Sequence, residues 1–220
     1  GELLGGDQGR ALIEAADAKQ EELQKGQDLL KKAVQREPTN PYFTESLARC
    51  FLRLFQKMAT DAQLKGGQDP AALEPERDKA LAQAGEEYDK LMKAIEKDPP
   101  KDPAVITIAL RKRGQFHLSA RDGAQTEYQS KQMQRVSPGE LKAILDRLKE
   151  HAKQAFDSLG EAIKNSPNDQ ESLVLMGAYY RSMLSLSPDE KVRKQKNEAN
   201  EAKAKELYEQ AIKADPDSFD

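Results

Sequence analysis

The sequence is poor in the residues that build disulfides, metal centres and acid–base sites. It contains one cysteine, Cys50, and two histidines, His117 and His151, in 220 residues. A disulfide framework or a thiolate zinc site needs several sulfur atoms, so both are excluded within the chain. Cys50 lies inside an apolar helical run, and we expect it to be a small buried side chain.

Long apolar runs and a strong net charge are also missing. The apolar runs are only a few residues long, whereas a transmembrane helix needs roughly 20. The formal net charge is −3, so no strong electric field draws the chain to nucleic acid or to an anionic membrane. We therefore expect no membrane span and no nucleic-acid partner. The first residue is Gly1 and no signal peptide follows, which fits a processed or excised chain and leaves the compartment open between the cytoplasm and the periplasm or cell exterior.

Motifs that carry catalysis are absent from the sequence. There is no glycine-rich phosphate loop, no GxSxG elbow, no HExxH pattern and no nucleophile beside a base. His117 in "GQFHLSA" and His151 in "LKEHAKQAF" are the only near-neutral bases, and we expect a packing or surface role for each. A metal site built on this pair would need a third and a fourth ligand, which no spacing suggests. We predict no catalytic residue, no metal site, no cofactor and no enzymatic activity.

One helix ending occurs four times. "AVQREPTN" (33–40), "AIEKDPPK" (94–101), "AIKNSPND" (162–169) and "AIKADPDS" (211–218) each place an alanine five residues and a β-branched residue four residues before a proline. The prolines are Pro38, Pro99, Pro167 and Pro216. A bulky residue lies a turn or so further back in each copy: Leu30, Leu91, Leu159, and Leu207 with Tyr208. Small and large residues at helical spacing let a neighbouring helix approach closely, and the proline ends the helix.

Charged residues make up 33% of the chain and hydrophobic residues 37%, which favours long amphipathic helices. Apolar residues in steps of three and four predict a helix before each proline, the first from about residue 8 to 37. "SPGE" at 137 and "SPDE" at 187 predict N-caps, with Glu140 and Glu190 closing a capping box. Helices over about 41–63, 103–121 and 169–186 follow the first three prolines after short linkers, which force antiparallel packing. Loops are predicted at 64–75, 121–138 and 184–188, and 121–138 is the segment most typical of disorder.

These residues resemble tetratricopeptide repeats, a helix-turn-helix family with a period of about 34 residues. The resemblance is clearest for two segments. The first contains Ala155, Leu159, Ala162 and Pro167, followed by "LVLMGAYY" with Leu173, Met176, Gly177 and Tyr180; the second contains Ala204, Tyr208, Ala211 and Pro216. A looser copy includes Gly26, Leu30, Ala33 and Pro38, then Leu47, Ala48 and Phe51. The register of 103–121 stays open, because Lys112 stands where an aromatic residue is expected, and the second helices are longer than in the family.

The resemblance implies an all-α fold: a right-handed α-α superhelix of about seven antiparallel helices, forming a single domain over 1–220 that belongs to a longer protein. It also implies a non-catalytic scaffold whose first helices line a concave groove for a protein or peptide. On the predicted first helices, an arginine ladder could bind an acidic partner: Arg49, Arg53, Arg111, Arg113 and Arg181. The alternative is that these arginines pair with glutamates of neighbouring helices. The carboxylate clamp of the family is missing, since Glu45, Arg49, Val174 and Ala178 occupy its positions.

Aromatic side chains suggest a second candidate surface. We expect Tyr42 and Tyr179 to be exposed and able to anchor a partner. Two other functions stay open. A bacterial-envelope solute-binding or transporter accessory protein would explain the long helices and would require a closed apolar cavity. A self-assembly module would follow from the apolar surface that an uncapped helical stack exposes.

Overall fold

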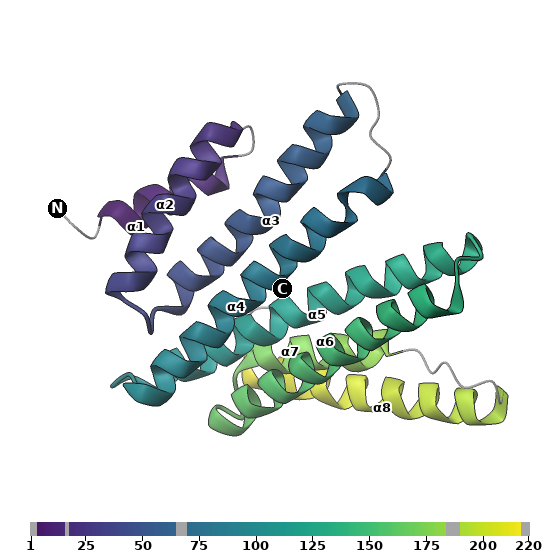
Figure 1. Ribbon diagram of the computed structural model, residues 1–220. Helices are drawn as coiled ribbons and strands as arrows, with labels where there is room; N and C mark the ends of the chain where they lie inside the picture. Colours follow the sequence, from purple (N-terminus) through teal and green to yellow (C-terminus); the bar gives the residue numbers. More distant parts are fainter. Residues whose placement is uncertain (1–3, 16–17, 65–69, 184–189, 217–220) are drawn as a thin grey trace. The chain divides into compact units, whose positions relative to one another are not determined.

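The computed structural model describes residues 4–15, 18–64, 70–183 and 190–216 (Figure 1). These residues form eight α-helices and one 3-10 helix, with no strand among them, which confirms the all-α prediction. In chain order the helices are α1 (Leu4–Glu14), α2 (Gln20–Arg36), α3 (Pro41–Leu64), the 3-10 helix η1 (Pro70–Leu73), α4 (Glu74–Lys97), α5 (Pro103–Met133), α6 (Pro138–Asn165), α7 (Gln170–Ser182) and α8 (Glu190–Ala214).

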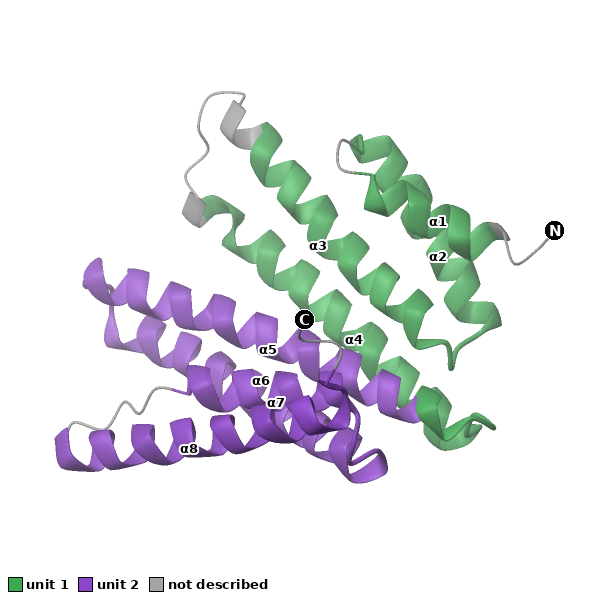
Figure 2. Ribbon diagram, turned by 180° about the vertical axis from the view of Figure 1, so that it is seen from behind, with its two compact units in different colours: residues 1–105 green, residues 106–220 purple. Residues whose placement is uncertain are grey.

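The chain divides into two compact units, Gly1–Val105 and Ile106–Asp220 (Figure 2). Unit 1 contains α1 to α4, and unit 2 contains most of α5 together with α6, α7 and α8. Each unit has a hydrophobic core of its own, built around Leu30 and Leu47 in unit 1 and around Leu159 and Leu173 in unit 2. The prediction of a single domain over residues 1–220 stays a prediction.

The predicted helix over 8–37 is wrong, because this segment forms two helices. α1 ends at Glu14 and α2 begins at Gln20. The two lie antiparallel and close together: a Cβ atom on Gly9 would come within 2.9 Å of Leu30 Cγ, and one on Gly26 within 2.8 Å of Ile13 Cγ2. The two glycines therefore allow the backbones of α1 and α2 to approach closely. Burial of Ile13 and Leu23 between the two helices stabilises the hairpin.

All four repeated sequences end a helix through the same hydrogen bond. The residue before each proline donates its backbone N–H to the carbonyl of the motif's alanine, four residues back. The bonds are Glu37 to Ala33, Asp98 to Ala94 and Ser166 to Ala162, each 2.9 Å, and Asp215 to Ala211, 3.1 Å. Glu37, Asp98 and Ser166 leave helical geometry with ψ of 70°, 83° and 89°, because a residue before proline avoids the α conformation. The helix-ending role of the motif is confirmed at each position.

Two of the connections after these endings are alike. Asn40 N donates to Glu37 O, and Asp169 N donates to Ser166 O, both at 3.0 Å. The side chains of the same two residues then accept from the backbone N–H three residues further on: Asn40 Oδ1 from Phe43 N at 3.4 Å and Asp169 Oδ2 from Ser172 N at 3.1 Å. Asn40 Oδ1 also accepts from Tyr42 N at 3.0 Å. The turn between α2 and α3 and the turn between α6 and α7 therefore share one backbone bond and one side-chain cap at corresponding positions.

A second repeated contact sets the register of the helix pairs. In three pairs, a glycine of the first helix faces the residue eight positions before the proline of the second helix: Gly9 faces Leu30, Gly114 faces Leu159 and Gly177 faces Tyr208. An added Cβ would lie 2.6 Å from Leu159 Cγ and 2.8 Å from Tyr208 Cε1. This contact places Gly114 at the position of Gly177, and so settles the register of α5.

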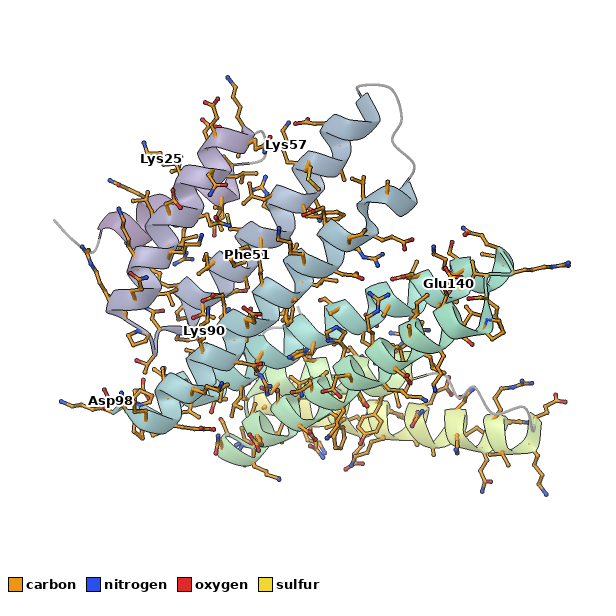
Figure 3. All side chains as sticks on the ribbon, viewed as in Figure 1. Lys25, Phe51, Lys57, Lys90, Asp98 and Glu140 are labelled. Atoms are coloured by element: carbon orange, nitrogen blue, oxygen red, sulfur yellow. The ribbon has the colours of Figure 1, made fainter. Side chains whose placement is uncertain are left out.

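The loop predicted over 121–138 is also wrong. α5 continues to Met133, and only a short connection precedes α6. Arg121 and Ala124 are buried and Tyr128 is half-buried, at helical spacing, and Glu127 binds Arg147 of α6 at 2.9 Å. At the start of α6, where Figure 3 labels Glu140, the predicted capping box is confirmed. Glu140 N donates to Ser137 Oγ, and Ser137 N donates to Glu140 Oε2. Residues 187–189 of the second predicted cap lie outside the described residues.

Candidate binding surfaces and the buried histidine pair

An open hollow of about 310 Å³ in unit 1 is the main candidate site, and we call it the α3 groove. Its floor is one face of α3, formed by Phe51, Leu54, Phe55 and Met58. These positions follow the i, i+3, i+4, i+7 spacing that places side chains on one side of a helix. Phe51, which is labelled in Figure 3, is buried, but Leu54, Phe55 and Met58 are only half-buried, so the floor offers apolar surface to a ligand.

The walls of the α3 groove come from α2 and α4, which lie on either side of α3 (Figure 1). The α2 wall consists of Gln20, Gln24, Gln27 and Lys31, and the α4 wall of Glu76, Lys79, Ala80 and Gln83. Gln27 Oε1 accepts hydrogen bonds from Gln24 Nε2 at 2.8 Å and from Lys31 Nζ at 3.1 Å. The site therefore has an apolar floor and walls rich in amides.

A second hollow in unit 1, of about 680 Å³, lies between the turn that follows α2 and the turn that follows α4. Pro38, Pro41 and Pro100 line it together with Tyr42. Tyr42 is 43% exposed, which confirms its predicted exposure. We call this hollow the turn hollow.

The predicted arginines of α3 lie on the face of this helix that α1 contacts, not in the α3 groove. Arg49 binds Glu45 at 3.1 Å and Glu14 of α1 at 3.9 Å. Arg53 donates to the carbonyl of Ala15, just after the end of α1, at 2.9 Å. Both arginines therefore link α3 to the end of α1. The sequence predicts α1 and α2 as one continuous helix.

In unit 2 the predicted arginines mostly bind acceptors of their own chain. Arg111 binds Asp169 at 2.8 Å and Glu171 at 3.0 Å, and thereby joins α5 to the beginning of α7. Arg113 donates to Ser158 Oγ at 3.1 Å and to Gln154 Oε1 at 2.7 Å, both on α6. Arg181 is exposed. Arg49 and Arg111 thus form the ion pairs with glutamates that the alternative predicts.

The predicted exposure of Tyr179 is wrong, since this side chain is only 6% exposed. Its ring packs against Phe156 and Tyr180 and lies 5.3 Å from the guanidinium carbon of Arg121. Arg121 itself is 1% exposed and also binds Asp122, Ser182 Oγ and the Tyr179 carbonyl. A buried arginine therefore occupies the side of α7 where the sequence suggests a free aromatic surface. Burial raises the pKa of Tyr179.

The structure brings His117 and His151 together between α5 and α6. Their Nδ1 atoms are 3.1 Å apart, so one ring donates a hydrogen bond to the other. His117 is 7% exposed, and within the described part of the chain its Nε2 has no hydrogen-bond partner. Phe116 packs edge-on against both rings.

The surroundings of the pair favour neutral imidazoles. Burial, and then the charges of Arg113 and His151, lower the pKa of His117 to about 3. Burial and the charge of Arg147 lower the pKa of His151, and the charge of Glu150 partly offsets this decrease. Both rings are therefore uncharged at neutral pH, and their neighbours are mostly cationic. The pair acts as a polar packing contact with an unusual sensitivity to acid.

Other chemistry-bearing groups do not assemble into a site among the residues that the structure covers. No group of three or more histidine, cysteine, aspartate or glutamate side chains there could hold a metal ion. Cys50 is fully buried, as predicted, and contacts the Leu23 carbonyl at 3.3 Å; burial raises the pKa of its thiol to about 11. Among the described helices, none is both long and apolar enough to cross a bilayer.

Comparison of the chain with models of known protein families and with curated proteins gives no match. Sequence reasoning missed the α3 groove and the histidine pair. Leu54, Phe55 and Met58 show the spacing of a helix stripe in the sequence, but such a stripe usually belongs to a core. The two histidines are 34 residues apart, and no local pattern joins them.

Proposed function

We propose that this chain is a non-catalytic scaffold of tetratricopeptide-like helix pairs that binds a protein or peptide partner, and that the α3 groove is its binding surface. The observation that carries this proposal is the half-buried apolar floor of the groove, Leu54, Phe55 and Met58. Apolar surface in an open hollow between polar walls is typical of peptide-recognition sites.

The repeated geometry supports the architectural part of the proposal, a right-handed superhelix. Gly9, Gly114 and Gly177 make equivalent contacts in three helix pairs, and four helices end through the same bond. Successive first helices run parallel within each unit. In unit 1 the pairs Glu14–Arg49 and Ala15–Arg53 join α1 to α3, and in unit 2 the pairs Arg111–Asp169 and Arg121–Tyr179 join α5 to α7. A stack of antiparallel helix pairs produces this arrangement.

The open form of the hollows favours a macromolecular ligand over a small solute. Small-molecule sites usually enclose most of the ligand surface. The α3 groove and the turn hollow are instead open to solvent along one side. A protein or peptide can cover such a surface without being enclosed by it.

The experiment is an affinity capture from the native lysate with the wild-type chain and three variants. Phe55→Glu places a charge on the groove floor, and Gln56→Glu adds the same charge at the next position of α3, where the side chain is exposed. Tyr42→Ala removes the exposed ring of the turn hollow. We expect a protein that is captured by the wild type, Gln56→Glu and Tyr42→Ala, and is lost with Phe55→Glu.

Circular dichroism of each variant checks that the helices persist. Loss of the partner with Tyr42→Ala alone would move the site to the turn hollow. Equal capture by all four proteins would show that neither hollow binds the partner. Absence of any specific partner in repeated captures, from lysates in which the chain is expressed, would contradict the scaffold function itself.

A further inference from the structure

We infer that the α3 groove binds an extended peptide segment that seats an aromatic side chain on Phe55 and Met58 and carries an acidic residue beside it, facing Lys31. The inference rests on the proposed function and specifies its ligand. Three features of the groove lead to it: the shape of its floor, the amides of its walls and its balance of charge.

In unit 2 an aromatic side chain occupies the position that corresponds to part of the α3 groove. Phe51 stands thirteen residues after Pro38, as Tyr180 stands after Pro167, and Gln27 stands eleven residues before Pro38, as Phe156 stands before Pro167. In unit 2, Phe156 packs on Tyr180 and Tyr179, with ring centroids 6.3 and 5.7 Å away. In unit 1 an amide takes the place of this aromatic ring, beside Phe51 in the α3 groove.

The floor of the groove also continues where the corresponding helix of unit 2 has ended. α7 stops at Ser182, fifteen residues after Pro167, whereas α3 extends to Leu64, twenty-six residues after Pro38. Leu54, Phe55 and Met58 lie on this extension and are half-buried. Aromatic rings and a methionine thioether attract a further aromatic ring. The floor is therefore suited to an aromatic side chain from outside the chain.

The walls favour an extended backbone over a helix. Gln20, Gln24, Gln27 and Gln83 line both sides of the floor. The side chains of Gln20 and Gln83 form no hydrogen bond within the part of the chain that the structure describes, and the Gln27 side chain uses only its oxygen. Amides donate and accept, so they match the free N–H and C=O groups of an extended peptide, whereas a helix satisfies these groups internally.

The charge of the walls selects an acidic flank. The lining of the groove includes two lysines, Lys31 and Lys79, and one carboxylate, that of Glu76. Lys79 is 3.8 Å from Glu76, while Lys31 binds the neutral Gln27 oxygen. The excess of one positive charge lies on the α2 wall at Lys31. A carboxylate next to the aromatic anchor would complement this charge.

The test is a selection of random twelve-residue peptides, displayed on phage, against the immobilised 220-residue chain. The selected sequences are synthesised with a fluorescent label, and their affinities are measured by fluorescence anisotropy. We expect enrichment of peptides with an aromatic residue and an aspartate or glutamate within three positions of it. Phe55→Glu should weaken binding at least tenfold, and Lys31→Glu two- to fivefold, the range of an exposed ion pair.

Lys25→Glu is the matched control for Lys31→Glu, because Lys25 is an exposed lysine of the same helix outside the groove. It should leave affinity unchanged, and a glutamine in place of the peptide's acidic residue should remove the difference between wild type and Lys31→Glu. Met58→Ala serves as a second floor variant if Phe55→Glu does not fold. Selected peptides without aromatic residues, or an equal effect of Lys25→Glu and Lys31→Glu, would overturn the inference.

The two failures can be told apart. If the lysate capture yields a partner that Phe55→Glu does not affect, the scaffold function stands and the ligand inference falls. If neither the lysate nor the peptide library yields a ligand, both fall.

Discussion

At the scale of single residues, one buried hydroxyl group departs from the rule that buried polar atoms are paired. Thr44 is fully buried, and its Oγ1 has no hydrogen-bond partner among the residues that the structure describes. It stands six residues after Pro38, and Leu173 stands at the same position after Pro167, with 1% exposure. The equivalent position thus accepts an apolar side chain in unit 2.

Thr44→Val should therefore stabilise the chain. Valine has nearly the shape of threonine without the hydroxyl, and removal of a buried, unpaired hydroxyl is worth about 1 kcal/mol of unfolding free energy. Urea unfolding followed by circular dichroism measures the change. Thr60→Val on the same helix is the control, because Thr60 is exposed and donates to the Gln56 carbonyl at 2.9 Å. Lower stability of Thr44→Val would indicate that the hydroxyl has a partner.

At the scale of helices, α5 contains two glycines in very different surroundings. A Cβ atom on Gly114 would lie 2.6 Å from Cγ of the fully buried Leu159, whereas one on Gly123 would meet nothing within 4 Å. The same substitution at these two positions thus separates close packing from helix propensity.

Gly123→Ala should stabilise the protein by about 0.5–1 kcal/mol, since alanine favours the helix over glycine. Gly114→Ala should destabilise it by about 1–3 kcal/mol, because the overpacked α5–α6 contact outweighs the same gain. The two melting temperatures, compared with that of the wild type, give the result. A rise in both would mean that the two helices can separate at no cost, and that Gly114 does not set their distance.

The sequence predicted the helix endings well because their causes are local. A proline disfavours helical geometry at the residue before it, and that effect depends on neighbours in the chain alone. The division between α1 and α2 was not predictable in this way. Residues 14–19 contain three alanines and favour a helix, whereas the turn is favoured by the packing of α1 on α2, including the close approach of Gly9 and Gly26.

The register of α5 was hidden by an insertion. Gly177 follows Pro167 by ten residues, but Gly114 follows Pro99 by fifteen. Arg113 and His117 then stand where Met176 and Tyr180 stand in α7, so the expected apolar pattern is missing. Polar residues are accommodated at these two positions because their side chains bind polar partners on α6, namely Ser158, Gln154 and His151. The partners of the predicted arginines could not be predicted for the same reason, because the acceptors of Arg53 and Arg113 are distant in sequence.

At the scale of the whole molecule, the two units differ in their response to acid. Both histidines belong to unit 2. The folded state holds the pKa of His117 at about 3, below its ordinary value of 6.5. The unfolded state therefore binds more protons below pH 6.5, and the stability of unit 2 falls as pH decreases from 6.5 towards 3.

Between pH 7 and pH 5, His117 should lower the stability of unit 2 by about 2 kcal/mol. Hydrogen exchange followed by mass spectrometry measures protection in each unit at the two pH values. We expect faster exchange in α5 and α6 at pH 5, after correction for intrinsic rates, with unit 1 much less changed. His117→Phe should abolish most of the difference. Equal loss of protection in both units would assign acid sensitivity to carboxylates instead.

The turns at Glu37–Asn40 and Ser166–Asp169 have matching hydrogen bonds, although they join different helices. Both turns carry the same backbone bond and a side-chain cap to the N–H three residues further on, although only the proline is identical in "EPTN" and "SPND". In both turns the residues of the tetrapeptide itself supply the acceptors of the bonds at which the chain reverses direction. A protein built in this way can diversify its helix faces, and with them its ligands, while the joints between helices stay the same.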